Sequence, residues 1–361
     1  MVSDASGRPL ASAAATASAA AGAAGAVPTP AQGMGTLPAG ATITLGDVAT
    51  KPSRSLLSNA LRQFRRNKMA MASVVFLGFL AVVAVTAPLI APHNPVQSDV
   101  KVAGKYRQAA WVDSADPKKD GTWDHPLGTD SIGRDVFSRL VFGTRISIVV
   151  GFVPMAVILL IGVPIGVAAG YFGGRLDNLL MRLTDIVYAF PALLFFLVMQ
   201  ISFGSTRFGS LLNGLILLFV TLSIVNWTGV ARLVRGTTLS LKEKEFVEAA
   251  KAGGAGTWRI ITRHILPNAL GPMIVAAAFI VPGAIIAEAV LTYLGIGLRP
   301  DVNLGAPFPT SWGQMIQDGQ RNYNVQSWML IAPSVAVALI TLAFTFIGDG
   351  LRDALDPREQ I

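Results

Sequence analysis

Six long apolar stretches limit what this 361-residue chain can fold into. They cover about residues 69–89, 146–171, 186–203, 211–230, 269–293 and 328–347. A helix of about 20 apolar residues is long enough to cross the hydrocarbon core of a bilayer. A helix also satisfies its own backbone hydrogen bonds where no water is present. The sequence therefore predicts an all-α polytopic membrane protein with six transmembrane helices.

Composition agrees with this prediction and excludes several classes of site. Hydrophobic residues make up 52% of the chain and charged residues 14%, which is too apolar for a soluble protein of this length. Cysteine is absent, and the three histidines (His93, His125 and His264) are far apart in sequence, so we expect no metal site. The net charge of +8 is typical of nucleic-acid binding, but basic segments facing anionic lipid account for it, so we expect no nucleic-acid partner.

The N-terminal region predicts a tail, a surface helix and an orientation. Residues 1–54 are mostly Ala, Gly, Ser, Thr and Pro, so they have too little apolar surface to fold and we expect disorder. Leu57, Leu61 and Phe64 share one helical face among basic residues, which predicts an amphipathic helix on the membrane surface. Residues 51–68 carry six basic residues and no acid, which places the N-terminus in the cytoplasm. Six crossings return the C-terminus to the same side.

A polar segment, residues 231–268, interrupts the apolar pattern between the fourth and fifth spans. Seven basic residues accompany three acids there, which places the segment in the cytoplasm. Its first half predicts a helix with small and apolar side chains beside an acid. These side chains belong to Phe246, Glu248, Ala249 and Ala250. Gly254 would end this helix and a second would begin near Trp258, which leaves an ordinary helical hairpin as the simpler interpretation.

Several motifs taken together resemble the permease subunits of importer-type ABC transporters. Glu-Ala-Ala at 248–250, Gly254 and the pair Leu266-Pro267 have the spacing of the cytoplasmic coupling loop of that family. Further runs resemble the C-type subunit of its peptide importers. These runs are residues 125–130, 133–139, 143–147, 309–315 and 348–358. The resemblance covers about residues 55–358, with 301–308 as extra residues.

The resemblance implies a type I ABC importer permease fold and half of a translocation pathway for dipeptides or oligopeptides. It implies a homologous second permease, two cytoplasmic ABC ATPases, an extracytoplasmic solute-binding protein, a peptide substrate and membrane lipid as partners. ATP and Mg²⁺ would bind the ATPases, so we expect neither a cofactor nor catalytic residues here. The expected location is a bacterial or archaeal cell (inner) membrane. The residues that would couple to an ATPase are Phe246, Glu248, Ala249, Ala250, Gly254, Leu266 and Pro267.

The expected organisation follows from these assignments. It comprises a tail (1–54), a surface helix and first span (55–92), an extracytoplasmic loop (93–145), a core permease domain (146–350) containing the coupling loop 231–268, and a cytoplasmic tail (351–361). In the extracytoplasmic loop we expect a turn capped by Asp130 or Ser131 and then a short helix with paired charges.

The spans carry two further local signals. Gly162, Gly166 and Gly170 recur every four residues in the second span, which indicates close approach of another helix. Arg182 and Asp185 lie one helical turn apart and would pair.

Other functions remain open on the residues alone. Glu288, near the outer end of the fifth span, is a candidate for the substrate pathway, although structural pairing explains it equally well. A self-contained secondary transporter or channel would need ionisable residues inside several spans, whose interiors here are almost free of charge. An intramembrane enzyme would need converging nucleophiles or metal ligands. The substrate stays open among dipeptides, oligopeptides, nickel chelates and other solutes.

Overall fold

The computed structural model describes residues 56–98, 100–101, 103–299, 303, 305 and 307–355. The predicted disordered tail, residues 1–54, lies outside them, as do half of residues 301–308 and the last six residues of the chain. The chain divides into two units, Met1–Ser53 and Arg54–Ile361, and the fold below is that of the second unit.

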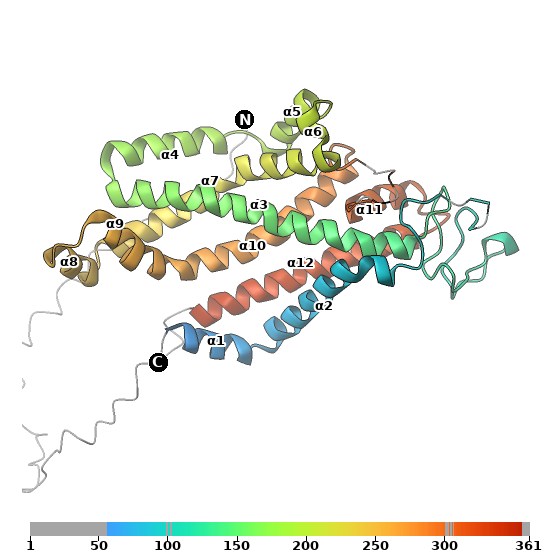
Figure 1. Ribbon diagram of the computed structural model, residues 1–361, viewed down its shortest axis with the longest axis horizontal. Helices are drawn as coiled ribbons and strands as arrows, with labels where there is room; N and C mark the ends of the chain where they lie inside the picture. Colours follow the sequence, from blue (N-terminus) through green and yellow to red (C-terminus); the bar gives the residue numbers. More distant parts are fainter. Residues whose placement is uncertain are drawn as a thin grey trace, which may run out of the picture. The chain divides into compact units, whose positions relative to one another are not determined.

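The described part of the chain is helical apart from two isolated β-bridges in the loop after the first span (Figure 1). Five of its segments are long and apolar enough to cross a membrane. They contain α2 (Lys68–Ile90), α3 (Val136–Phe172), α7 (Leu215–Lys242), α10 (Leu266–Tyr293) and α12 (Trp328–Leu355). A sixth is the pair α4 (Gly174–Tyr188) and α5 (Ala192–Phe203), which bends by 77° between its halves.

Helices α3 and α7 pack together along the glycine stripe predicted in the second span. A Cβ atom on Gly166 would lie 2.6 Å from the carbonyl oxygen of Ala231, so only glycine allows this approach. The contacts run in register along both helices. Gly162 faces Trp227 and Val230, Gly166 faces Ala231 and Val234, and Gly170 faces Arg235 and Thr238. Residue numbers rise together on the two helices, so α3 and α7 run in the same direction.

This parallel arrangement assigns a role to the bent pair α4 and α5. Consecutive spans that point the same way require the chain to return across the membrane between them. Only α4 and α5 lie between α3 and α7, apart from the short α6 (Arg207–Ser210) and the 3₁₀ turn Leu211–Gly214. We therefore assign the pair as a broken third span, which brings the candidate crossings from five to the six predicted.

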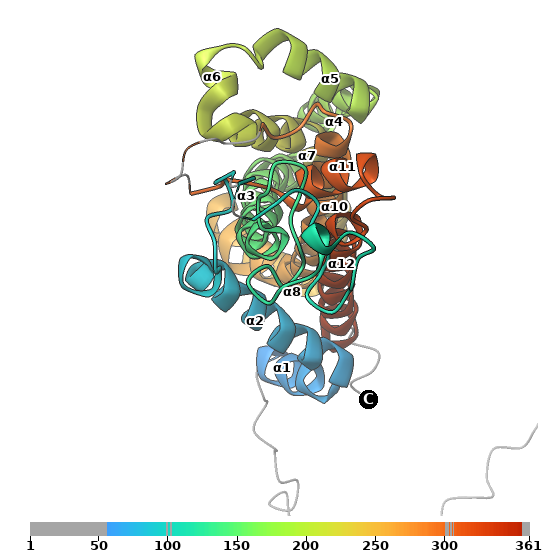
Figure 2. The ribbon, with the colours of Figure 1, turned by 90° about the vertical axis from the view of Figure 1, so that its right-hand side faces the viewer.

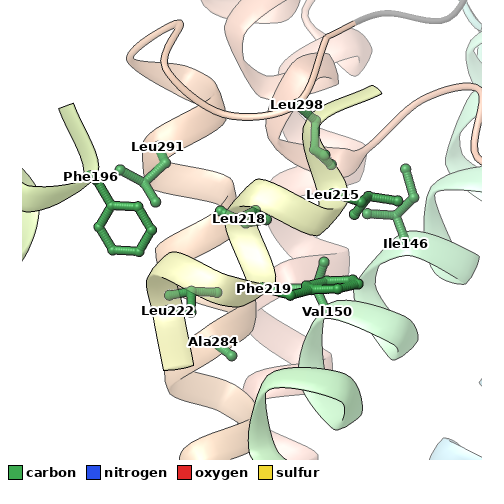
Figure 3. Packing of buried hydrophobic residues seen from close by; sticks show 10 residues of the cluster. All are labelled: Ile146, Val150, Phe196, Leu215, Leu218, Phe219, Leu222, Ala284, Leu291 and Leu298. Carbon is green, nitrogen blue, oxygen red and sulfur yellow. The ribbon is translucent and has the colours of Figure 1, made fainter. Parts of the chain in front are cut away.

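Three buried clusters hold the bundle together. One joins α3, α5, α7 and α10 (Figure 3). A second packs α3 against α10, α12 and α11 (Trp312–Arg321), around Trp312 and Met315. The third lies between α3 and α7 near Trp227 and Val234. Figure 2 shows α5 and α6 on one side of this core, with α2 and α1 (Leu56–Arg66) on the other.

Several predicted boundaries are wrong in the same way. Helix α3 begins at Val136 rather than near Ile146, and α7 continues to Lys242 rather than ending near Val230. Hydropathy detects the apolar part of a helix, and these helices extend beyond it.

Candidate functional site

The polar segment between α7 and α10 folds as a compact hairpin, residues 243–265. Helix α8 (Glu245–Ala252) is followed by a turn and then by α9 (Thr257–Ile260). Gly254 has φ +78° in that turn, a conformation that glycine adopts without strain. A π-helical turn, Ile261–Ile265, joins α9 to α10. The predicted helix, turn and second helix are all present.

Three buried side chains attach the hairpin to the bundle. Val247, Ile260 and Ile265 form a cluster against Tyr171 at the end of α3 and Leu241 at the end of α7. Val247 and Ile265 are fully buried. The hairpin is therefore fixed to the ends of two long helices, and a force on it would reach both of them.

The opposite face of the hairpin is exposed. Phe246 is 39% exposed beside the ring of His264, and Glu248 and Ala249 are exposed next to it on α8. Gly254 and Pro267 are also exposed, while Ala250 and Leu266 are half-buried. Trp258 is 76% exposed on α9 and was not among the predicted coupling residues. The sequence placed Trp258 only near the start of the second helix and carried no signal for its exposure.

Two ion pairs connect α4 to α7 close to the hairpin. Asp177 accepts two hydrogen bonds from Arg235, at 2.6 and 2.7 Å. Asp185 accepts one from Arg232 at 2.8 Å, and the Arg232 guanidinium lies 4.3 Å from the ring centre of Tyr188. The predicted pairing of Asp185 with Arg182 is therefore wrong. Helix α7 supplies the cation because α4 packs against it.

An apolar cavity of about 440 Å³ lies beside α7. Its lining residues come from α3, α5, α7 and α10. They are Ile158, Ala192, Phe196, Leu222, Asn226, Gly229, Val230, Leu233, Ala276, Phe279, Ile280, Gly283, Ala284 and Ala287. Asn226 is the polar side chain among them. The cavity walls are apolar, and small residues on α10 leave space in it. The described part of the cavity lining therefore contains no charged binding site.

Glu288 does not line this cavity. Its side chain is buried, at 1% exposure, and its Oε1 accepts a hydrogen bond from the Thr292 hydroxyl at 2.9 Å. Glu288 therefore makes a structural contact within α10, and its role in the substrate pathway stays a prediction.

The loop between α2 and α3 is organised by a buried charge network. Asp130 accepts from the guanidinium groups of Arg134 at 2.6 Å and Arg139 at 2.8 Å, and Arg139 also donates to Asp318 on α11. Burial lowers the pKa of Arg134, and the neighbouring Arg139 lowers it further. The paired charges were predicted, but the short helix is the first part of α3. The turn before it is capped by Asp130, as predicted, because Oδ1 of Asp130 accepts from the backbone N–H groups of Ile132 and Arg134 at 3.0 and 2.9 Å. The N-cap of α3 itself is Asp135.

Two of the three histidines come together on this side of the molecule. The rings of His93 and His125 stack with their centres 4.4 Å apart, although 32 positions separate the two residues in sequence. Separation in sequence therefore does not keep this pair apart in space. No periodicity connects two positions in an irregular loop, so the sequence carried no signal for it.

Comparison with known proteins assigns the family. Residues 162–361 match the model for binding-protein-dependent transport system inner membrane components, and residues 55–109 match the N-terminal TM domain of oligopeptide transport permease C. The dipeptide transport system permease protein DppC of Bacillus subtilis is 39% identical over 86% of this chain and 89% of that protein. The oligopeptide transport system permease protein OppC of Haemophilus influenzae is 39% identical over 85% and 90%.

Among solved structures, an inward-facing form of the MetNI methionine ABC transporter has a TM-score of 0.49 at 21% identity, covering 61% of this chain and 97% of that chain. The family model spans more than half of the sequence, and the two curated relatives align with most of it. The chain is a multi-pass membrane protein that belongs to the family of binding-protein-dependent transport system inner membrane components, the permease subunits of ABC importers.

Proposed function

We propose that this chain is the C-type permease subunit of an importer for dipeptides or oligopeptides. The curated relatives named above are described as dipeptide and oligopeptide permeases, and they align with the chain over nearly its whole described length. The proposal includes a second, homologous permease, two cytoplasmic ATPases and an extracytoplasmic solute-binding protein. ATP and Mg²⁺ belong to the ATPases in this proposal, and this chain performs no catalysis.

The main support for coupling is that the hairpin has one exposed face, while its other face is anchored to α3 and α7. Phe246, Ala249 and Trp258 present apolar surface to solvent although the hairpin has a buried cluster of its own. Exposed aromatic side chains next to small residues are typical of a protein interface. In our proposal α8 and α9 insert into a groove of one ATPase. Glu248 lies at the rim of this contact, where it orients the hairpin.

Movement of the ATPases then reaches the membrane through the long helices. Because Val247 packs on α3 and α7, displacement of the hairpin displaces the helices that line the apolar cavity. Closure of the ATPases on ATP would therefore change the access of this cavity from one side of the membrane to the other. ATP drives this change only if it binds the closed arrangement more tightly than the open one.

The apolar cavity would form this chain's half of the pathway. Small residues at Gly229, Gly283 and Ala287 keep its surface open, and a second permease would provide the facing wall. An apolar wall suits cargo with variable side chains, because it offers few fixed hydrogen-bonding groups that would select one sequence. The rival, a self-contained secondary transporter, would instead place coupling ions within this chain.

Docking can be tested with a matched pair of exposed tryptophans. Trp258 on the hairpin is 76% exposed and Trp123 in the loop after α2 is 77% exposed. We expect Trp258→Ala to weaken binding of the ATPase subunits to the purified permease pair by at least about tenfold, the cost of losing an aromatic anchor. Trp123→Ala should leave this affinity unchanged. Equal affinities for wild type and Trp258→Ala would contradict docking at this face.

The substrate class can be tested separately in proteoliposomes. The complete complex should take up a labelled dipeptide or tetrapeptide only with ATP inside and the solute-binding protein outside. Uptake of a nickel chelate but not of peptides would leave the coupling mechanism intact and refute the substrate. Uptake by this chain without ATPases would instead support the secondary-transporter alternative.

A further inference from the structure

His93, His125 and Asp135 form a compact group at one end of the bundle. His93 follows α2, His125 lies in the loop, and Asp135 caps α3. Each residue offers one potential metal-ligand atom, and these atoms all lie within 4.8 Å of one another. The group therefore joins three separate segments of the chain at one point.

Carboxylates hold the two imidazole rings in position. Oδ1 of Asp135 lies 3.1 Å from Nδ1 of His125, while its Oδ2 accepts from the backbone N–H of Ser138. Asp135 is therefore fixed by the start of α3, and it fixes the ring of His125 in turn. A carboxylate that orients a histidine ring is a recurrent feature of protein zinc sites.

A second carboxylate faces both rings from the solvent side. Oxygens of Asp124 lie 3.6 Å from Nε2 of His93 and 3.7 Å from Nε2 of His125. Ligand atoms about 2.0–2.1 Å from a tetrahedral zinc ion are roughly 3.3 Å apart, so these separations are close to those of a coordinated ion. The side chain of Asp124 is 72% exposed and can adjust to complete a coordination sphere.

One further observation favours a ligand at this point. A small cavity of about 80 Å³ is lined by His93, Asp124, His125 and Asp135, which is enough space for an ion and its water.

The donor set selects the kind of ion. Imidazole nitrogens suit zinc, copper, nickel and iron, whereas calcium and magnesium prefer a shell of oxygen atoms. Two imidazoles with a carboxylate leave a coordination position for water, and the chain has no cysteine to compete. We propose that Nε2 of His93, Nε2 of His125 and the carboxylate of Asp124 bind one divalent transition-metal ion of the zinc class, while Asp135 orients the ring of His125 from its other nitrogen. The bound ion connects the loop to the ends of α2 and α3.

Zinc binding to the full-length chain tests this proposal directly. The protein is purified with a histidine-free affinity tag, treated with chelator and titrated with Zn²⁺ at pH 7.5. We expect one ion per wild-type chain. His93→Ala should weaken binding by at least about tenfold, because it removes a ligand. The matched control is His264→Ala, since His264 lies on the distant hairpin, and this variant should bind Zn²⁺ as wild type does.

His93 suits the test because its side chain is 34% exposed, so its loss should not unfold the loop, whereas His125 is buried. A second readout is thermal stability. Saturating Zn²⁺ should raise the melting temperature of wild type and of His264→Ala, because a ligand that binds only the folded state stabilises it. It should not raise that of His93→Ala. Absence of stoichiometric zinc binding by wild type, or equal binding by both histidine variants, would overturn the proposal.

Discussion

Glu288 and Thr292 show what a buried polar pair contributes at the scale of single residues. The Thr292 hydroxyl donates to Glu288 and accepts from the backbone N–H of Leu298 at 3.2 Å. One side chain therefore satisfies a carboxylate and also attaches the loop after α10 to the helix. An acid at membrane depth suggests transport, but these contacts give Glu288 a structural use.

Replacing the hydroxyl should destabilise the protein without affecting the pathway. We expect Thr292→Val to lower the free energy of unfolding by about 1–3 kcal/mol, because the buried carboxyl group loses one of its hydrogen bonds and the Leu298 amide loses its partner. Thermal unfolding in detergent measures this change. Thr292→Ser keeps the hydroxyl and should stay close to wild type. A loss of peptide uptake in Thr292→Val at unchanged stability would support a role of Glu288 in the pathway.

At the scale of helices, the stripe on α3 decides how close α7 can come. At Gly166 the nearest atoms that a Cβ would meet include the backbone oxygen of Ala231, which cannot rotate away as a side chain can. Gly236, on α7, has open space where its Cβ would be. Both glycines lie inside transmembrane helices, but only Gly166 is in close contact with another helix. Comparing the two positions therefore separates the effect of packing from the effect of helix propensity.

This difference predicts opposite effects of the same substitution. Gly166→Ala should lower the free energy of unfolding by about 1–3 kcal/mol, because the two helices must move apart. Gly236→Ala should be neutral or stabilising by up to about 1 kcal/mol, because alanine is the better helix former. Thermal melting of the two purified variants compares them. Similar melting temperatures would mean that α3 and α7 are not in close contact along this stripe.

At the scale of the whole molecule, the number of crossings fixes which segments share a side of the membrane. With α4 and α5 as one broken span, the loop after α2 and the hairpin lie on opposite sides. If α4 and α5 instead formed a re-entrant loop, which enters and leaves the membrane on one side, the loop after α2 and the hairpin would lie on the same side. The parallel contacts between α3 and α7 favour the first arrangement.

Cysteine labelling can test this arrangement, because the natural chain has no cysteine. Lys118 in the loop and Lys251 on the hairpin are both exposed. In intact cells a membrane-impermeant maleimide should label Lys118→Cys, while Lys251→Cys should react only after permeabilisation. Bound ATPases should slow labelling at position 251 and not at position 118. Labelling of both variants from the outside would refute six crossings.

The sequence predicted the parts of this fold that depend on long apolar runs. The apolar spans and the hairpin around Gly254 follow from local composition. It could not predict where α3 begins, because Ser138 and Arg139 are polar and become buried only through partners such as Asp130. The partner of Arg232 and the stacking of His93 on His125 depend on which segments meet in space, and no local pattern records that.

Helix α3 contacts the histidine group with its first turn and the hairpin with its last turn. Its N-cap, Asp135, positions the ring of His125, and Tyr171 in its last turn contacts the cluster that holds the hairpin. A helix of 37 residues is about 55 Å long, well beyond the roughly 30 Å of the hydrocarbon core. A tilt of this one rod would displace both ends at once. A displacement at one end of α3 can thus be transmitted mechanically to the other end through one continuous helix.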